Sequence, residues 1–297
     1  MKTATHGTES FSSVNIKAAL LFMGILDFVA NHSGTLLALL TTGACAGLLA
    51  GLLGVGGGII IVPVLFFLFQ SDDVSPASAM VSATATSLAT IVPTSISSIR
   101  AHHIKGNVDC PLLARWGPFI LLGVLLGSWL VTWINGTWVI TLFGIIATLS
   151  ALSGLCRSDS PLFEELPNRV GQSVMASAVG FFSVLVGIGG GTLSVPLLTA
   201  HHYPVHKAVG TAAAIGLIIA LPGVLTMLAL GGTPVDAPVG NLGLVNLIGF
   251  ACIVPMTVLC APFGAVLAGK LAAVKLKKIF DAVLLVTGLR MLAQSFL

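Results

Sequence analysis

The sequence predicts an all-α polytopic membrane protein, and its composition and its long apolar runs support that prediction. Of the 297 residues, 56% are hydrophobic and only 8% are charged, whereas soluble globular domains carry roughly 25% charged residues. A membrane-spanning helix needs about 20 predominantly apolar residues, and the mean hydropathy of +1.06 fits a chain filled with such helices. The apolar runs are unbroken, which excludes a transmembrane β-barrel, because barrel strands alternate apolar and polar residues.

Charge and cysteine usage narrow the expected partners. The formal net charge is +3, from 13 basic and 10 acidic residues, and charges this sparse do not form a nucleic-acid surface. The five cysteines are scattered and include no CxxC pair, so we expect packing residues and no disulfide framework. The lipid bilayer and a small solute are the expected partners, with no nucleic acid and no cofactor.

Ten apolar stretches follow a polar leader. The run at 16–30 precedes them and is interrupted by Lys17 and Asp27. It is short for a span, the leader before it is long, and Asp27 sits just before any cleavage point, so we expect an interfacial helix, or alternatively a further span, rather than a signal peptide. The ten stretches lie at 34–53, 58–69, 77–99, 111–134, 137–156, 171–186, 191–200, 207–230, 241–266 and 278–297. The most polar connection, 157–169, divides the chain near its middle.

The chain contains an internal duplication. Residues 54–65 read GVGGGIIIVPVL and residues 187–198 read GIGGGTLSVPLL, so glycines, a Val-Pro pair and a leucine match at a constant offset. Asn107 and Asn241 follow at corresponding loop positions, where helix capping is expected. The predicted organisation is a leader and N-terminal helix at 1–33, a first transmembrane repeat at 34–156, a cytoplasmic linker at 157–170 and a second repeat at 171–297.

The basic residues predict how these stretches cross the membrane, because Lys and Arg collect in cytoplasmic loops. If all ten stretches cross, the non-cytoplasmic side receives only Lys2 and Lys17, beside the acidic Asp72, Asp73 and Asp236. The cytoplasmic side then receives Arg100, Lys105, Arg157, Arg169, Lys207, Lys270, Lys275, Lys277 and Lys278. If both short glycine-rich segments instead re-enter, these residues divide almost evenly. The crossing arrangement is therefore favoured, with five spans in each half and the halves inverted.

Inverted repeats with Gly/Pro-interrupted short helices at matching positions are typical of secondary transporters and mark the midplane site. Irregular backbone survives inside a bilayer only where protein buries it or where it lines a polar cavity. A helix that begins just after such a loop directs its free N–H groups and positive dipole end at the occupant of that cavity. This geometry suits an anion.

The candidate substrate-binding residues follow from this geometry, and each has a structural alternative. The loop glycines either line the substrate path or allow close helix packing. Pro63 and Pro196 either leave a carbonyl free beside the substrate or mark a kink or an early helical turn. Thr84 and Thr211 either donate to an oxyanion or bond a carbonyl of their own helix. Arg100 either draws anions to the cytoplasmic mouth or follows the positive-inside rule. The glycines are Gly54, Gly56, Gly57, Gly58, Gly187, Gly189, Gly190 and Gly191.

The paired GxGGGxxxVPxL segments resemble the sulfite exporter TauE/SafE family, also called the 4-toluene sulfonate uptake permeases. The resemblance extends over nearly the whole chain from Gly34, and it includes the Ala208–Thr211 step and the Gly-rich helices near Gly123 and Gly264. It implies a permease for small sulfur-containing or organic anions such as sulfite, sulfonates or sulfoacetate. Val81-Ser-Ala-Thr84 departs from the family's Gly-Thr-Ser-like step, which weakens a symmetric assignment of polar ligands.

The leading hypothesis is a secondary anion transporter of the cytoplasmic (inner) membrane that works by alternating access. No Walker-type segment is present, so a gradient must supply the energy. The alternatives are a permease for a divalent metal or for a non-sulfur carboxylate, and an intramembrane enzyme. No HExxH motif and no GxSx motif with a paired histidine supports an enzyme, and a metal site is not expected at His202 and His206 because Pro204 separates them. Gly123 and Gly127 can pack helices within one protomer or between protomers of a homodimer.

Overall fold

The computed structural model describes residues 33–156, 163, 165–268 and 271–295, without the side chains of 156 and 271–277. The predicted helix at 16–30 lies outside the described residues. Packing divides the chain into two units, Met1–Leu39 and Leu40–Leu297, and the account below concerns the second.

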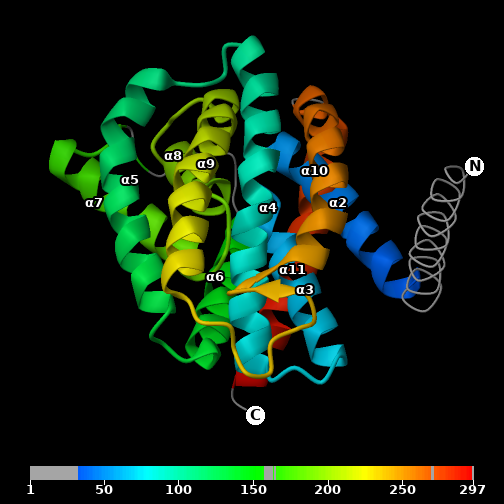
Figure 1. Cartoon of the computed structure of the whole chain (residues 1–297). Helices are drawn as coiled ribbons and strands as arrows, with labels where there is room; N and C mark the ends of the chain where they lie inside the picture. Colours follow the sequence, from blue (N-terminus) through cyan, green and yellow to red (C-terminus); the bar gives the residue numbers. More distant parts are fainter. Residues whose placement is uncertain (1–32, 157–162, 164, 269–270, 296–297) are drawn as a thin grey trace, which may run out of the picture. The chain divides into compact units, whose positions relative to one another are not determined.

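The described residues form ten helices and one short hairpin (Figure 1). The helices follow the predicted apolar stretches closely, because glycine and proline interrupt the runs where helices end. They are α2 (Ser33–Leu53), α3 (Gly58–Ser71), α4 (Pro76–Ile104), α5 (Cys110–Val131), α6 (Gly136–Cys156), α7 (Arg169–Leu185), α8 (Gly191–Ala200), α9 (Val205–Leu230), α10 (Leu247–Leu267) and α11 (Leu271–Ser295).

The stretch predicted at 241–266 is only partly helical. Residues 241–246 form a two-stranded antiparallel hairpin, β1 (Asn241–Leu242) and β2 (Val245–Asn246). Helix α10 begins after it because the side chain of Asn246 caps the helix, accepting the Gly249 N–H at 2.7 Å. The expectation that Asn107 and Asn241 are helix caps is wrong, since Asp109 and Asn246 fill that role. The last helix begins at Leu271 and not at 278.

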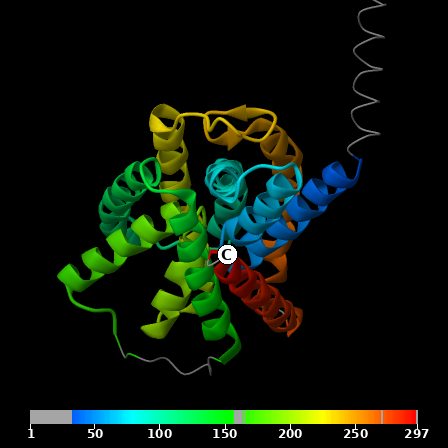
Figure 2. The same cartoon turned by 90° about the horizontal axis from the view of Figure 1, so that it is seen from below.

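Several helix pairs of one half have a counterpart when the two halves of the chain are exchanged. Helix α4 packs on α9, and α6 packs on α11. Helix α4 also packs on α10, and α5 packs correspondingly on α9. Residues 43–51 of α2 pack on α10, and α5 packs correspondingly on α7. Figure 2 shows α4 end-on, with α9, α3 and α6 around it.

Glycines make the closest of these helix contacts. A Cβ atom placed on Gly47 would lie 2.6 Å from the Thr257 carbonyl oxygen of α10, and one on the matching Gly180 would lie 2.3 Å from the Ile120 carbonyl oxygen of α5. Gly123 and Gly127 contact Ser177 and Phe181 of α7, so this GxxxG pattern packs helices within the chain. Small residues at these crossings let the helix backbones approach closely.

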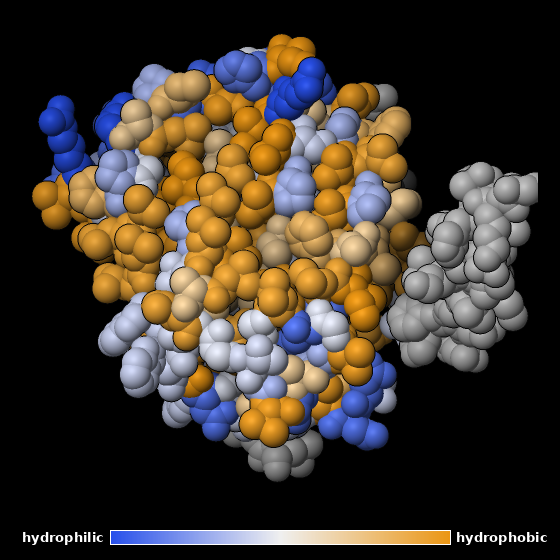
Figure 3. Space-filling model, viewed as in Figure 1, coloured by the Kyte–Doolittle hydropathy of each residue, from blue (hydrophilic) through white to orange (hydrophobic). Residues whose placement is uncertain are grey.

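The surface of the second unit has the character of a membrane protein. Six helices are long and apolar enough to cross a membrane, namely α2, α4, α5, α6, α9 and α10. Large hydrophobic side chains such as Leu126, Trp138, Leu225 and Phe263 are exposed on them. Figure 3 shows a hydrophobic band across the middle of the visible face, with hydrophilic residues gathered above and below it. The chain is therefore a polytopic all-α membrane protein.

Candidate functional site

Two glycine loops meet inside the second unit, where every residue from 54 to 58 and from 186 to 191 is buried. The first loop joins α2 to α3, and the second joins α7 to α8. A Cβ atom placed on Gly191 would lie 2.1 Å from the Gly54 carbonyl oxygen, and one on Gly189 would lie 2.2 Å from the Val55 carbonyl oxygen. The loops thus touch backbone to backbone. Because this contact leaves no room for a side chain, it explains why positions 189 and 191 are glycine.

The two loops reach this contact with different backbones. Gly54, Gly56 and Gly57 have φ angles of 67°, 74° and 79°, whereas in the second loop only Gly187 is left-handed, with φ of 69°. Side chains rarely occupy this region of φ. The first loop therefore depends on glycine for its conformation, while Gly190, which is right-handed with φ of −54°, is glycine because Ile215 and Gly216 crowd its Cβ position.

The N–H groups at the contact lack acceptors. Among the described residues, no acceptor receives the N–H groups of residues 55–59 or of residues 189–191. These groups belong to the first turns of α3 and α8 and to the loops before them, so two positive helix ends lie inside the protein. More than about 90% of buried backbone N–H groups are hydrogen-bonded in proteins. This cluster of orphaned donors is the chemical feature that distinguishes the site.

Hydroxyl groups of α4 line the same region. Ser87 Oγ donates to the Gly187 carbonyl oxygen at 2.8 Å and ties α4 to the second loop. Thr84, whose Cα lies 2.8 Å from the Cβ position of Gly187, is fully buried and its Oγ1 has no hydrogen-bond partner among the described residues. Ser95 on α4 and Thr192 on α8 are also buried, and their hydroxyls also have no hydrogen-bond partner among the described residues. The sequence pattern predicts Thr84 as a site residue but gives no signal for Ser95 or Thr192.

The other predicted site residues have the following places. Thr211 is buried near the start of α9, and its Oγ1 accepts the Asp109 N–H at 3.0 Å. It follows Val209 by two residues, and the Val209 carbonyl oxygen is 2.2 Å from the Cβ position of Gly54. Arg100 is exposed near the end of α4. Pro63 and Pro196 lie within α3 and α8, beyond the first turn of each. The structure therefore brings together the eight loop glycines and Thr84, with α9 touching the first loop just before Thr211.

An Asp109 cluster, consisting of Asp109, Tyr203 and Thr211, closes one end of the second unit. The Tyr203 hydroxyl donates to the Asp109 carboxylate, which also accepts the Leu112 N–H at 3.0 Å and so caps α5. Burial raises the pKa of the Asp109 carboxyl, but hydrogen bonds from Tyr203 and Leu112 and nearby positive charge outweigh burial, and the net pKa is lowered. The cluster joins the α4–α5 connection to the α8–α9 connection and keeps a carboxylate ionised there.

An Asp236 cluster, consisting of Asp236, Ser75 and Ser78, lies at the opposite end of α4. The Asp236 carboxylate accepts the Ser75 N–H at 3.0 Å and the Ser78 hydroxyl at 2.5 Å. Hydrogen bonds from Ser75 and Ser78 lower the pKa of Asp236 to about 2. The cluster joins the α9–α10 connection to the start of α4. The α9–α10 connection is the counterpart of the α4–α5 connection in the other half, and the start of α4 is the counterpart of the start of α9. The two clusters therefore join corresponding segments.

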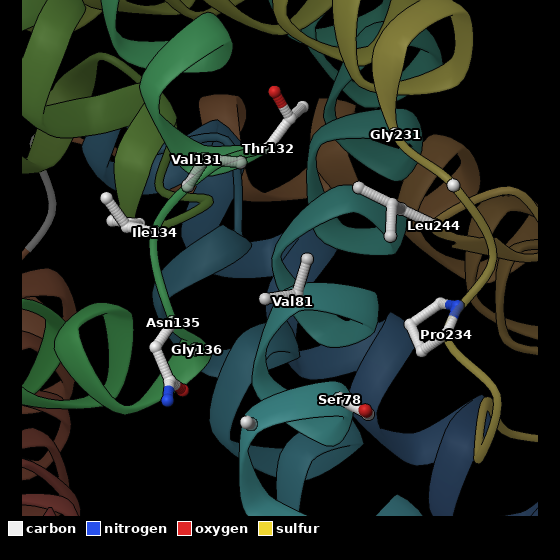
Figure 4. A pocket seen from close by; sticks show the side chains of 12 residues that line it. Ser78, Val81, Val131, Thr132, Ile134, Asn135, Gly136, Gly231, Pro234 and Leu244 are labelled. Carbon is white, nitrogen blue, oxygen red and sulfur yellow. The ribbon is translucent and has the colours of Figure 1, made fainter.

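A cavity of about 280 Å³ lies beside the Asp236 cluster (Figure 4). The start of α4 and the α5–α6 and α9–α10 connections line it, with Ser78, Thr132 and Asn135 as its polar side chains. Val81 is the lining residue furthest along α4, and Thr84 follows it within one helical turn. The cavity therefore leads from the end of the protein towards the buried hydroxyls near the second glycine loop.

The Asp236 cluster should make stability depend on acid pH. A carboxyl whose pKa is lowered on folding stabilises the folded state above its unfolded pKa of about 4, and that stability disappears as the pH falls towards the folded value. We expect Asp236→Asn to lower the melting temperature at pH 7, and the difference from the wild type to vanish as the pH approaches about 2. Thermal melts between pH 7 and pH 2 measure this. A difference that is constant over that range would contradict the assignment.

Comparison with known proteins identifies the family. The family model described as Sulfite exporter TauE/SafE matches residues 39–291. The chain belongs to the sulfite exporter TauE/SafE family. The predicted resemblance is thereby confirmed, and the match includes both glycine loops, all of α3 to α10 and the described side chains of α11 as far as Met291.

Relatives of this TauE/SafE protein are named as transporters. A probable membrane transporter protein of Haemophilus influenzae is 32% identical over 257 residues, which are 85% of this chain and 96% of the relative. A probable membrane transporter protein of Methanocaldococcus jannaschii is 26% identical over 263 residues, covering 86% and 94% of the two chains. No solved structure matches the chain. The chain is thus a member of a family of membrane transporters rather than of enzymes.

Metal ligands do not gather in the described part of this TauE/SafE protein. No group of three or more His, Cys, Asp or Glu side chains there could hold a metal ion. His202 and His206 are both exposed. Asp281, a carboxylate buried on α11, packs against Gly154 of α6. The polar groups at the glycine loops are backbone N–H and carbonyl groups and the hydroxyls of α4 and α8.

Proposed function

We propose that this protein is a secondary transporter of small sulfur-containing or organic anions, and that the two glycine loops with Thr84 form its substrate site. The observation that supports the proposal is the cluster of buried N–H groups at residues 55–59 and 189–191, which have no acceptor in the described part of the chain. An N–H group can only donate, so the partner of such a cluster must be an acceptor. Two helix N-termini add positive potential, and an anion satisfies both demands.

The chemistry of the site separates this proposal from its alternatives. A divalent metal requires oxygen, nitrogen or sulfur acceptors as ligands, and orphaned N–H groups offer none. A non-sulfur carboxylate has the same oxyanion chemistry as sulfite or a sulfonate, so it differs by shape and charge alone. We favour the sulfur-containing anions because the matching family is described as Sulfite exporter TauE/SafE.

We propose further that the chain consists of two inverted five-span repeats, 34–156 and 171–297, joined by a cytoplasmic linker at 157–170 in the cytoplasmic membrane. The contact between α4 and α10 and its counterpart in the other half, the contact between α9 and α5, support this arrangement. The short helices α3 and α8 would then enter the membrane from opposite sides and meet at its midplane. Lys105 and Asp109 would face the cytoplasm, and Asp236 the opposite side.

Alternating access requires a closure at each end, and the two carboxylate clusters match that requirement. The Asp109 cluster and the Asp236 cluster each join an interhelical connection of one half to a segment of the other half. Opening one end would break one cluster while the other stays intact. The cavity beside the Asp236 cluster would be the non-cytoplasmic mouth of the path.

Ligand-induced stabilisation of the purified protein tests the proposed function. A ligand that binds only the folded state raises the melting temperature, and the rise grows with the logarithm of its concentration relative to its Kd. We expect sulfite, thiosulfate or sulfoacetate to raise it, and radiolabelled forms of the same anion to enter proteoliposomes. Stabilisation by acetate or succinate alone would favour the carboxylate permease. Stabilisation by Zn²⁺ or Mn²⁺ alone would overturn the anion site.

A further inference from the structure

Ser95, like Thr84, differs from the hydroxyl residues of α4 that bond within the protein. It is 1% exposed, yet its Oγ has no hydrogen-bond partner among the described residues. A serine inside a helix can bond the carbonyl oxygen one turn earlier, as Thr94 and Thr86 do at 2.7 Å on the same helix. The Ser95 hydroxyl makes no such bond, although burying an unpaired hydroxyl lowers the stability of the folded state.

The Ser95 hydroxyl and the Gly190 N–H converge on one point. A methyl group placed on Gly216 of α9 would lie 3.1 Å from Ser95 Oγ and 3.7 Å from the Gly190 nitrogen. The Gly190 N–H has no acceptor among the described residues, and it lies at the N-terminus of α8, a helix of 10 residues. The two unpaired donors therefore face the position that the missing side chain of Gly216 leaves open.

Apolar and uncharged groups surround this point. Ile91 Cγ2 lies 3.9 Å from the methyl position on Gly216, and Ile215 Cγ2 lies 2.4 Å from the Cβ position of Gly190. Ser95 is buried five positions before the exposed Arg100 on α4. An oxygen held here would be bound by neutral donors and by the dipole of α8.

We infer that Ser95 is a substrate-binding residue, which holds one oxygen of the transported oxyanion together with the Gly190 N–H. Gly216 keeps the position of that oxygen free. This inference rests on the proposed function. It adds Ser95 and Gly216, which lie outside the loop motif, to the substrate site. It also identifies the recognised group as an oxygen that accepts two hydrogen bonds, from the Ser95 hydroxyl and the Gly190 N–H.

Two single substitutions test the inference from opposite directions. Ser95→Ala removes the donor, and Gly216→Ala places a methyl group in the space that the bound oxygen would need beside the Gly216 Cα. We expect each to weaken sulfite binding about tenfold or more, as loss of a hydrogen bond to a charged group does. The double variant should bind no more weakly than Gly216→Ala alone, because both changes act on the same oxygen. Isothermal titration of the full-length protein with sodium sulfite, and in parallel with sodium acetate, measures these affinities.

Matched controls lie on the neighbouring helices. Ser97→Ala removes an α4 hydroxyl that bonds the Val258 carbonyl oxygen at 2.9 Å, and Gly117→Ala adds a methyl group on α5 that meets only Ile218 Cδ1 at 3.9 Å. Both should bind sulfite within about twofold of the wild type. Ser95→Ala should keep its melting temperature, since it removes no bond within the protein.

The outcomes separate the two proposals. Unchanged sulfite affinity in Ser95→Ala and Gly216→Ala would overturn the role of Ser95 and leave the anion site standing. A large fall in the melting temperature of Ser95→Ala would assign the hydroxyl to the fold instead, which also overturns it. A wild-type protein that binds neither sulfite nor acetate would overturn the proposed function, and the inference with it.

Discussion

Replacing Gly191 with alanine should abolish transport. The added Cβ would lie 2.1 Å from the Gly54 carbonyl oxygen and 2.6 Å from the Val55 Cα. Both are backbone atoms that no rotamer change can move, so the two glycine loops must separate. Misplacing binding groups by about 1 Å costs on the order of 100-fold in rate, and overpacking of this kind costs about 3 kcal/mol of stability. Uptake of labelled sulfite by proteoliposomes, normalised to the protein inserted, measures the effect.

The matched control for this substitution is Gly117→Ala in α5. A Cβ atom at Gly117 meets only Ile218 Cδ1, at 3.9 Å, so this variant should transport like the wild type. A wild-type uptake rate in Gly191→Ala would remove the loop contact from the mechanism. Loss of uptake in both variants would mean that the assay reports a general sensitivity to alanine.

Breaking the Asp109 cluster should open the predicted cytoplasmic end of the protein. Asp109→Asn combined with Tyr203→Phe removes a charge-assisted hydrogen bond, which is worth about 1.5 kcal/mol or more. A shift of this size in the equilibrium between closed and open states is about tenfold. The measurement uses a Thr84→Cys reporter in a background without native cysteines, labelled by a membrane-impermeant thiol reagent. Labelling from the cytoplasmic face should accelerate about tenfold, and labelling from the other face should slow down.

The Asp236 cluster supplies the opposite control. Asp236→Asn removes the acceptor of the Ser75 N–H and the Ser78 hydroxyl, so labelling of the same reporter should accelerate from the non-cytoplasmic face. Equal acceleration from both faces in either variant would indicate general loosening of the bundle. Acceleration of each variant from the wrong face would reverse the proposed topology.

Most of the helices could be predicted from the sequence because glycine and proline mark their ends. The Gly54–Gly58 loop and the Asn168 cap fall where the apolar runs break, and helices α3 and α7 begin there. The hairpin at 241–246 could not be predicted in this way. Its leucines and valine extend the apolar run, and its turn depends on Gly243, which is left-handed with φ of 59°. The hairpin also depends on Asn241, which donates to Ser82 Oγ of α4 at 2.9 Å.

The site was predictable to the extent that its chemistry lies in a repeated local motif. The loop glycines stand out in the sequence because three adjacent glycines recur at matched positions. Ser95 does not stand out, because the sequence around a serine is the same whether or not its hydroxyl bonds a carbonyl of its own helix. The Thr211 hydroxyl accepts the Asp109 N–H, a bond that its position in the sequence does not indicate. Only the packing of α9 on the α4–α5 connection reveals that bond.

The pairing of helices across the two halves also bears on how the protein is made. Residues 43–51 of α2 contact α10, α5 contacts α7 and α9, and α4 contacts α9 and α10. When the ribosome has released only the first five helices into the bilayer, none of these neighbours has been synthesised. The hydroxyls of α4 then have no protein cover on the side that α9 and α10 later occupy. The insertion machinery must therefore shelter a polar helix until the second half emerges, and the native core forms only near the end of translation.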